Sequence, residues 1–227
     1  MISRAAPILV LGGIGLVVLL AFAVTSGMSD AFDRSIIEAV RAEQLHDLLS
    51  PLRSITELGS TGAVTVVAVA TVLLGVLVGP WLPGVIGAVT IGLASLGNQA
   101  LKSIIARARP DLLDPIVEER GFSFPSGHSA LGMVAWGILG VLVIRSRLPR
   151  AVRLAIVAAF GVVIALIGLS RVWLGVHYPT DVLAGWTAGA VIVLVYARLT
   201  RRVSPEPGAV GVDADPAAPR SDPPAAG

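Results

Sequence analysis

The chain has 227 residues, of which 55% are apolar, 14% charged and 5% aromatic, and its mean hydropathy is +0.84. A soluble domain carries roughly 25% charged residues, so this composition excludes a typical water-soluble protein, a disordered chain, a collagen and a coiled coil. The net charge of +2 and the lack of any run of five basic residues leave no arm for a nucleic-acid partner. Cysteine is absent, which excludes a disulfide framework, a thiolate metal site and a thiol nucleophile.

Six segments are apolar and uncharged over roughly the 20 residues that a helix needs to cross a bilayer. They cover residues 7–27, 61–78, 85–101, 129–144, 154–169 and 182–197. Several are shorter than 20 residues, but flanking Arg side chains can reach the interface and lengthen them. The first segment also resembles a signal peptide, although its apolar run is longer than a signal core. The sequence therefore predicts an all-α fold, a bundle of six transmembrane helices.

The segment between the first two spans has mixed charge and apolar residues at helical spacing. These residues are Phe32, Ile36, Ile37, Val40, Leu48 and Leu49. They predict an amphipathic interfacial helix between helices 1 and 2. A solvated helix packed on the bundle is the alternative. His46 lies in this segment and is interpreted as a surface residue, and residues 79–84 are predicted to form a tight turn.

The last 25 residues differ from the rest of the chain. Residues 203–227 are rich in Pro, Ala, Gly and Asp and have no apolar periodicity, so we expect a disordered tail without a catalytic role. The chain then divides into a membrane domain, residues 1–202, and a tail, residues 203–227.

The orientation in the membrane follows from basic residues in short loops, which favour the cytoplasm. Eight basic residues fall on each side, so the count alone decides nothing. The loop between the fourth and fifth spans carries four Arg residues, at 145, 147, 150 and 153, and no acid. We therefore predict a multi-pass cell-membrane protein with this loop, both termini and the tail in the cytoplasm. The loops after spans one, three and five then lie outside.

Three polar segments converge on that outer side, and the first follows the third span. Lys102, the single lysine of the chain, is seven residues from Arg109, or two helical turns, so both are expected on one face of a helix that Pro110 ends. Two cations on one face suit an anion with several oxygens. Cations that merely reach the interface are the alternative reading. Arg107 is off this face and is expected to contact lipid headgroups or nothing.

The second segment opens the fourth span. Ser126 is a natural N-cap, and Gly127 lets the backbone approach a ligand closely. The free N–H groups at this helix start form an anion site, and His128 stands there with a pKa near neutrality. The alternative is a capped helix with an incidental surface histidine.

The third segment precedes the sixth span, whose first turn suits Pro179. Asp181 follows His177 by four residues and can fix one imidazole nitrogen, so that the other presents a lone pair. Arg171 adds a third cation. A loop histidine followed by a helix-capping Asp is the alternative.

Together the segments describe an oxyanion pocket with a nucleophilic His, an orienting carboxylate and a second His as acid. The Asp four residues on favours His177 as the nucleophile. Without Cys and with few His, a zinc or two-metal site is not expected, and no cofactor is expected either. The residues indicate phosphoryl transfer without a metal.

At these residues the sequence resembles the type 2 phosphatidic acid phosphatase (PAP2) superfamily. The family has three ordered motifs, and every motif position has its counterpart here, over a layout from about residue 29 to 197. The matching residues are Lys102, Arg109 and Pro110; Pro125, Ser126, Gly127 and His128; and Ser170, Arg171, His177 and Asp181.

The resemblance implies a role for each of these side chains. His177 would attack phosphorus and form a phosphohistidine, Asp181 would orient His177, and His128 would protonate the leaving oxygen and later help activate water. The implied phosphate-binding residues are Lys102, Arg109, Ser126, Gly127 and Arg171.

The expected function is a membrane phosphatase for a lipid phosphate or diphosphate at the outer face. Candidate substrates are polyprenyl diphosphates, phosphatidic acid, phosphatidylglycerol phosphate and prenyl phosphosugars. A vanadate-dependent haloperoxidase, whose relatives are typically soluble, and a non-catalytic lipid-phosphate binding or transport protein remain as alternatives. The sequence does not fix the lipid or the oligomeric state.

Overall fold

The computed structural model describes residues 2–42, 49–78, 81–110 and 119–201, and within these ranges every regular element is a helix. The helices are α1 (Ile2–Thr25), α2 (Asp30–Ala42), α3 (Leu49–Glu57), α4 (Thr61–Val78), α5 (Trp81–Ile105), α6 (Gly127–Arg145), α7 (Arg150–Trp173) and α8 (Pro179–Thr200). The all-α prediction is confirmed for these residues. His46 and the predicted tail lie outside the described ranges.

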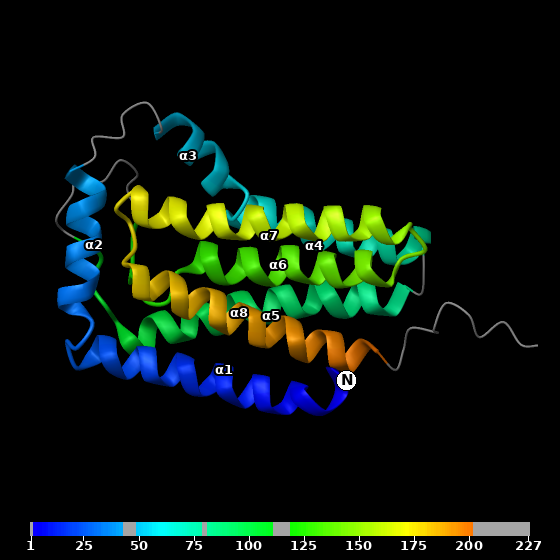
Figure 1. Ribbon diagram of the computed structural model, residues 1–227, viewed down its shortest axis with the longest axis horizontal. Helices are drawn as coiled ribbons and strands as arrows, with labels where there is room; N and C mark the ends of the chain where they lie inside the picture. Colours follow the sequence, from blue (N-terminus) through cyan, green and yellow to red (C-terminus); the bar gives the residue numbers. More distant parts are fainter. Residues whose placement is uncertain (1, 43–48, 79–80, 111–118, 202–227) are drawn as a thin grey trace, which may run out of the picture.

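The six long helices run side by side, and α2 crosses one end of the bundle (Figure 1). Five of them, α1 and α5 to α8, are long and apolar enough to span a membrane. The sixth span is obtained if α3 and α4, which are bent by 42° at a short break, form one broken span. Large apolar side chains such as Leu11 and Leu93 point outward and are 69% and 63% exposed, as suits contact with lipid.

Two predicted boundaries are wrong at the ends of α5. The helix begins at Trp81, so residues 81–84 of the predicted turn are helical. It ends at Ile105, because Ala106 adopts a left-handed backbone with φ of 50°. Arg109 therefore lies in an extended segment, and the prediction that Lys102 and Arg109 share one helix face is wrong.

The predicted amphipathic segment forms two helices in the structure. Ile37 of α2 is fully buried against Val172 of α7 and Val182 of α8, so the apolar face of α2 packs on the bundle. A position of α2 in the membrane interface remains a prediction.

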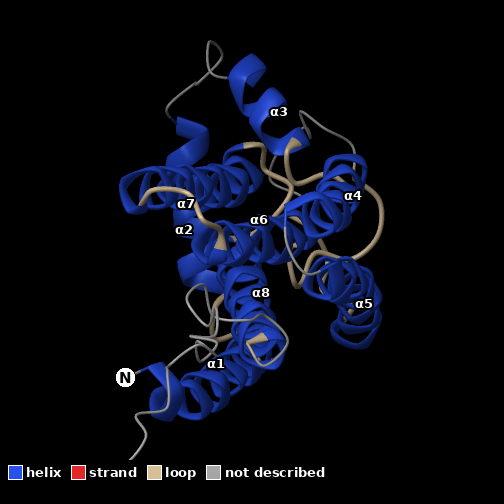
Figure 2. Ribbon diagram, turned by 90° about the vertical axis from the view of Figure 1, so that its right-hand side faces the viewer, coloured by secondary structure: helices blue, strands red, loops and turns tan. Residues whose placement is uncertain are grey.

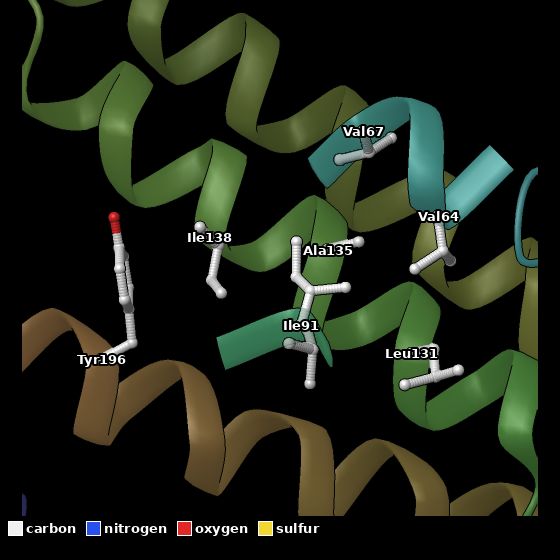
Figure 3. Close-up of a cluster of buried hydrophobic side chains, with 8 residues drawn as sticks. Val64, Val67, Ile91, Leu131, Ala135, Ile138 and Tyr196 are labelled. Carbon is white, nitrogen blue, oxygen red and sulfur yellow. The ribbon is translucent and has the colours of Figure 1, made fainter. Parts of the chain in front are cut away.

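Helix α6 lies at the centre of the bundle, surrounded by α4, α5, α7 and α8 (Figure 2). The main core lies between α6 and three of these neighbours, α4, α5 and α8, where burial of apolar side chains fixes the helix positions (Figure 3). Its buried members are Val64, Val67, Ile91, Leu131, Val134, Ala135, Ile138 and Tyr196.

Two glycines let α8 approach α6 closely beside the start of α6. A Cβ atom on Gly185 would lie 2.7 Å from the Ser126 carbonyl oxygen, and one on Gly189 would lie 2.8 Å from that of Ala130. Glycines four residues apart are typical of close helix contacts in membranes. This contact holds the start of α6 against the start of α8.

We predict that Gly185→Ala destabilises the protein by about 1–3 kcal/mol, because the new methyl group meets backbone atoms that cannot yield. Gly92→Ala in α5 is the matched control, because a Cβ there would meet nothing within 4 Å. The control should be neutral or more stable, since Ala favours a helix over Gly. Thermal unfolding in detergent measures both, and equal midpoints for the two variants would contradict the packing argument.

Candidate active site

The three polar segments meet at one end of the bundle, the end that α2 crosses (Figure 1). Two backbone hydrogen bonds join them. The Ser123 N–H donates to the Arg107 carbonyl at 2.8 Å, and the Ser126 N–H donates to the Asp181 carbonyl at 3.0 Å. Three segments that are distant in sequence thus become neighbours. They are the segment after α5, the segment just before α6 and the start of α8.

His177 is almost fully buried, with its side chain 1% exposed. Its Nδ1 lies 3.3 Å from Oδ2 of Asp181, a residue in the first turn of α8. The Tyr178 N–H and the Ser123 hydroxyl also donate to Oδ2. A proton on Nδ1 directed at this carboxylate leaves the lone pair on Nε2.

Burial lowers the pKa of His177 to about 4, although Asp181 acts in the opposite direction and Arg171 and Arg109 add to the lowering. The ring is therefore neutral at pH 7, as a nucleophile or base requires. Its Nε2 lies 3.2 Å from Nη1 of Arg109.

The start of α6 matches the sequence prediction. Ser126 is the N-cap, and its hydroxyl accepts hydrogen bonds from the N–H and the hydroxyl of Ser129. His128 is the second residue of the helix and is partly exposed at 23%. A Cβ on Gly127 would lie 3.2 Å from Nδ2 of Asn98, so glycine allows the close approach of α5 here.

The three predicted cations lie near this site, and each is held by different hydrogen-bond acceptors. Arg171 is buried and donates to the Thr56 hydroxyl of α3 at 2.7 Å. Arg109 donates to the carbonyls of Gly121 and Val176 at 3.0 and 2.9 Å. The Lys102 ammonium donates to the carbonyls of Phe122 and Ser123. Lys102 therefore holds the segment before α6 and does not contact the histidines.

Glu119 occupies the centre of the site, and sequence reasoning did not single it out. Its carboxylate pairs with Arg171, and with Nη1 of Arg109 at 2.9 Å. It also lies 3.8 Å from Nδ1 of His128 and 3.8 Å from Nε2 of His177. Burial would raise the pKa of the Glu119 carboxyl, but Arg171, the two histidines and Arg109 outweigh burial and hold this pKa below its ordinary value.

Arg107 corrects a second prediction. It was expected to contact lipid headgroups or nothing, but its guanidinium forms ion pairs with Asp181 at 2.6 Å and Asp33 at 2.7 Å. The helix geometry assumed for residues 102–109 caused this error, because the chain leaves the helix at Ala106 and Arg107 turns inward. Ser123 was also missed, since a lone Ser carries no recognisable spacing.

A cavity of about 310 Å³ opens beside His128. Its walls come from α3 and from the site itself, and they comprise Arg53, Ser54, Thr56, Glu57, Glu119, His128 and Arg171. Among the described residues, no group of three or more His, Asp or Glu side chains is arranged to hold a metal ion. The cavity is thus lined by His128, by Glu119 and its partner Arg171, and by side chains of α3.

Comparisons with known proteins agree with this architecture. The chain is similar to the crystal structure of a transmembrane PAP2 type phosphatidylglycerolphosphate phosphatase from Bacillus subtilis, with a TM-score of 0.77 and 26% identity, over 86% of this chain and 97% of that one. Phosphatidylglycerophosphatase B of Bacillus subtilis is 37% identical over 111 residues, 48% of this chain and 54% of the relative. An undecaprenyl-diphosphatase of Sulfolobus acidocaldarius is 30% identical over 116 residues, 48% of this chain and 51% of the relative.

The chain spans about half the length of these curated relatives. The family model of the PAP2 superfamily matches residues 83–204, which include all three motifs and the whole of α6, α7 and α8. The chain therefore belongs to the PAP2 superfamily.

Proposed function

We propose that this protein hydrolyses a lipid phosphate or diphosphate through a phosphohistidine intermediate, without a metal ion or cofactor. The position of the Glu119 carboxylate carries the proposal. Its two oxygens are held by Arg109 and Arg171 and lie within 4 Å of both histidines. A phosphoryl group has the same kind of oxygens, and it fits the same two arginines once Glu119 withdraws.

In the first step, Nε2 of His177 attacks phosphorus and the bond to the leaving oxygen breaks. The Asp181 carboxylate holds the Nδ1 proton and stabilises the positive charge that develops on the ring. Arg109 and Arg171 neutralise the phosphoryl oxygens as charge develops on them. Lys102, Ser126 and the Gly127 amide complete the phosphate-binding set that the family motifs imply.

His128 would give its proton to the leaving oxygen, which becomes the alcohol or the monophosphate product. It lines the 310 Å³ cavity beside α3, so the leaving group would occupy this cavity. In the second step, water attacks phosphorus, its proton returns to His128, and the phosphorus–nitrogen bond to His177 breaks. Inorganic phosphate and the resting enzyme result.

The apolar outer surface of the bundle supports a lipid as the substrate. The chains of a lipid can stay among the exposed apolar side chains while the headgroup enters at the end of the bundle. The relatives suggest phosphatidylglycerol phosphate or a polyprenyl diphosphate, and phosphatidic acid and prenyl phosphosugars remain candidates. We place the site on the extracytoplasmic face, with both termini in the cytoplasm.

The two histidines should fail in different ways. His177→Ala is expected to abolish phosphate release and to form no phosphoenzyme. His128→Ala should lose about 10²–10⁴-fold on a lipid phosphate, the usual contribution of a general acid. It should lose less on an aryl phosphate, because a nitrophenolate leaves without a proton. Phosphate release from both substrates, and acid-quenched phosphohistidine, measure these effects. If His177→Ala still formed phosphoenzyme, and His128→Ala lost equal activity on both substrates, His128 would be the nucleophile and His177 the acid.

Removal of the Glu119 charge should favour anion binding. Vanadate mimics the five-coordinate phosphorus and must displace the carboxylate from Arg109 and Arg171. Glu119→Gln is therefore expected to lower the vanadate concentration for half-inhibition by about tenfold, equivalent to about 1.4 kcal/mol. Glu38→Gln, an exposed site on α2, controls for the lost negative charge. An unchanged or higher vanadate requirement in Glu119→Gln would mean that the carboxylate does not compete for the anion site.

The orientation can be tested by labelling single cysteines, because the natural chain contains none. Ser54→Cys on α3 should react with a membrane-impermeant maleimide in intact cells. Leu148→Cys, in the exposed loop between α6 and α7, should react only after permeabilisation. The reverse pattern would move the site to the cytoplasmic leaflet.

A further inference from the structure

Three charged side chains form a line behind His177, on the side away from Glu119. Arg107 lies in the middle of this line. Its Nη1 donates to Oδ1 of Asp181 at 2.6 Å, and its Nη2 donates to Oδ2 of Asp33 at 2.7 Å. Both carboxylates are fully buried, whereas the arginine is 10% exposed. The proposed mechanism assigns no step to Arg107 or to Asp33.

The two oxygens of Asp181 have separate partners. Oδ2 faces Nδ1 of His177 and accepts the Tyr178 N–H and the Ser123 hydroxyl, whereas Oδ1 faces Arg107. A carboxylate can rotate about its last bond, so the partners on Oδ2 do not by themselves hold the second oxygen. The ion pair with Arg107 fixes the second oxygen and therefore the direction of the first.

Asp33 in turn fixes Arg107. Its Oδ2 accepts from Arg107 and from the Thr180 hydroxyl, and its Oδ1 accepts the Thr180 N–H at 3.1 Å. Thr180 is the residue before Asp181, so Asp33 of α2 binds both the arginine and the start of α8. The Arg107 guanidinium also lies 4.0 Å above the centre of the Tyr178 ring, beside His177 in the chain.

We propose that Arg107 is a positioning residue that aims the Asp181 carboxylate at His177, and that Asp33 holds Arg107 in place for this task. The inference rests on the proposed function for its catalytic readout. Arg107 does not line the 310 Å³ cavity, and its side chain contacts neither Glu119 nor His128 in the structure. Its loss should therefore affect the chemical step and leave substrate binding unchanged.

The first experiment compares kcat and KM for phosphate release from a lipid phosphate. Arg107→Gln is expected to lower kcat by about 10–100-fold, the size of loss seen when the hydrogen-bond partners that orient histidine ligands are removed from metal sites. The KM should stay within about twofold, as it should for any group that acts on the transition state alone. Arg107→Lys should recover most of kcat, because it restores a positive charge beside the Asp181 carboxylate. Arg34→Gln on α2, an exposed neighbour of Asp33, is the matched control and should leave both constants unchanged.

A double-mutant comparison tests whether Arg107 acts through Asp181. In an Asp181→Asn background the carboxylate is gone, so a further Arg107→Gln should reduce kcat by no more than about threefold, because residues that act as one unit are not additive. A full additional loss would overturn the proposal, as would a raised KM with kcat unchanged.

Arg107→Gln leaves two buried carboxylates without their cation and could fail to fold. The charge-balanced Arg107→Gln/Asp33→Asn variant removes one of these carboxylates, and Asp181 keeps His177, Ser123 and the Tyr178 N–H as partners, so this variant should unfold at a midpoint close to that of the natural chain. It should still show the lowered kcat. A normal kcat in this folded variant would overturn the proposal.

A spectroscopic readout keeps the test independent of turnover. The chain has three histidines, so the Nδ1 proton of His177 can be resolved in protein labelled with ¹⁵N-histidine and assigned by its loss in His177→Ala. This resonance should move or vanish in Arg107→Gln and in the charge-balanced variant, and persist in Arg107→Lys and Arg34→Gln. An unchanged resonance in a folded Arg107→Gln would overturn the positioning role. If the natural chain released no phosphate from any lipid phosphate, the proposed function would fail, and the resonance would still decide the role of Arg107.

Discussion

The arrangement of this site depends on one buried residue, Asp181, in the first turn of α8. Its main-chain carbonyl accepts the Ser126 N–H, which ties the start of α6 to the start of α8. Its carboxylate binds His177, Ser123 and Arg107, which come from three different stretches of the chain. A buried carboxylate requires charged and hydrogen-bonding partners to offset the loss of water, so burial of Asp181 demands that these stretches converge. Fold and site are therefore coupled at this residue.

Charge balance explains why so many cations can share a small volume. Arg109, Arg171 and Lys102 lie around one site, and without a negative charge between them their mutual repulsion would oppose folding. Glu119 supplies a negative charge in the resting protein, and Asp181 and Asp33 supply two more around Arg107. The resting site is thus nearly neutral, and under the proposed function a substrate phosphate would take the place of the Glu119 carboxylate rather than enter a cluster of unpaired cations.

The helical spans and the motif residues were predictable because each is a local pattern. An apolar run identifies a span, Ser126 before a helix identifies an N-cap, and a His followed by an Asp four residues on identifies a pair that can meet. Arg107, Asp33 and Glu119 were not predictable in this way. Their partners lie 9 to 147 residues away in the sequence, and the turn at Ala106 that redirects Arg107 depends on a single backbone angle that no residue type announces. The family motifs identify residues such as His177 and Asp181, whereas the residues packed behind them, Arg107 and Asp33, are recognised only when the chain is folded.

The glycine contact between α6 and α8 has a mechanical consequence. The α8 backbone lies against the Ser126 carbonyl at Gly185, and against the Ala130 carbonyl and the Met133 side chain at Gly189, so the two helices have little room to shift here. For one helix to slide along the other, the two would first have to separate. We therefore expect α6 and α8 to move as one rigid unit. His128 stands on one helix and Asp181 on the other, so the contact fixes the spacing between these two side chains. Under the proposed function, a rearrangement that admits a bulky headgroup would then involve Glu119 and α3 rather than the contact between α6 and α8.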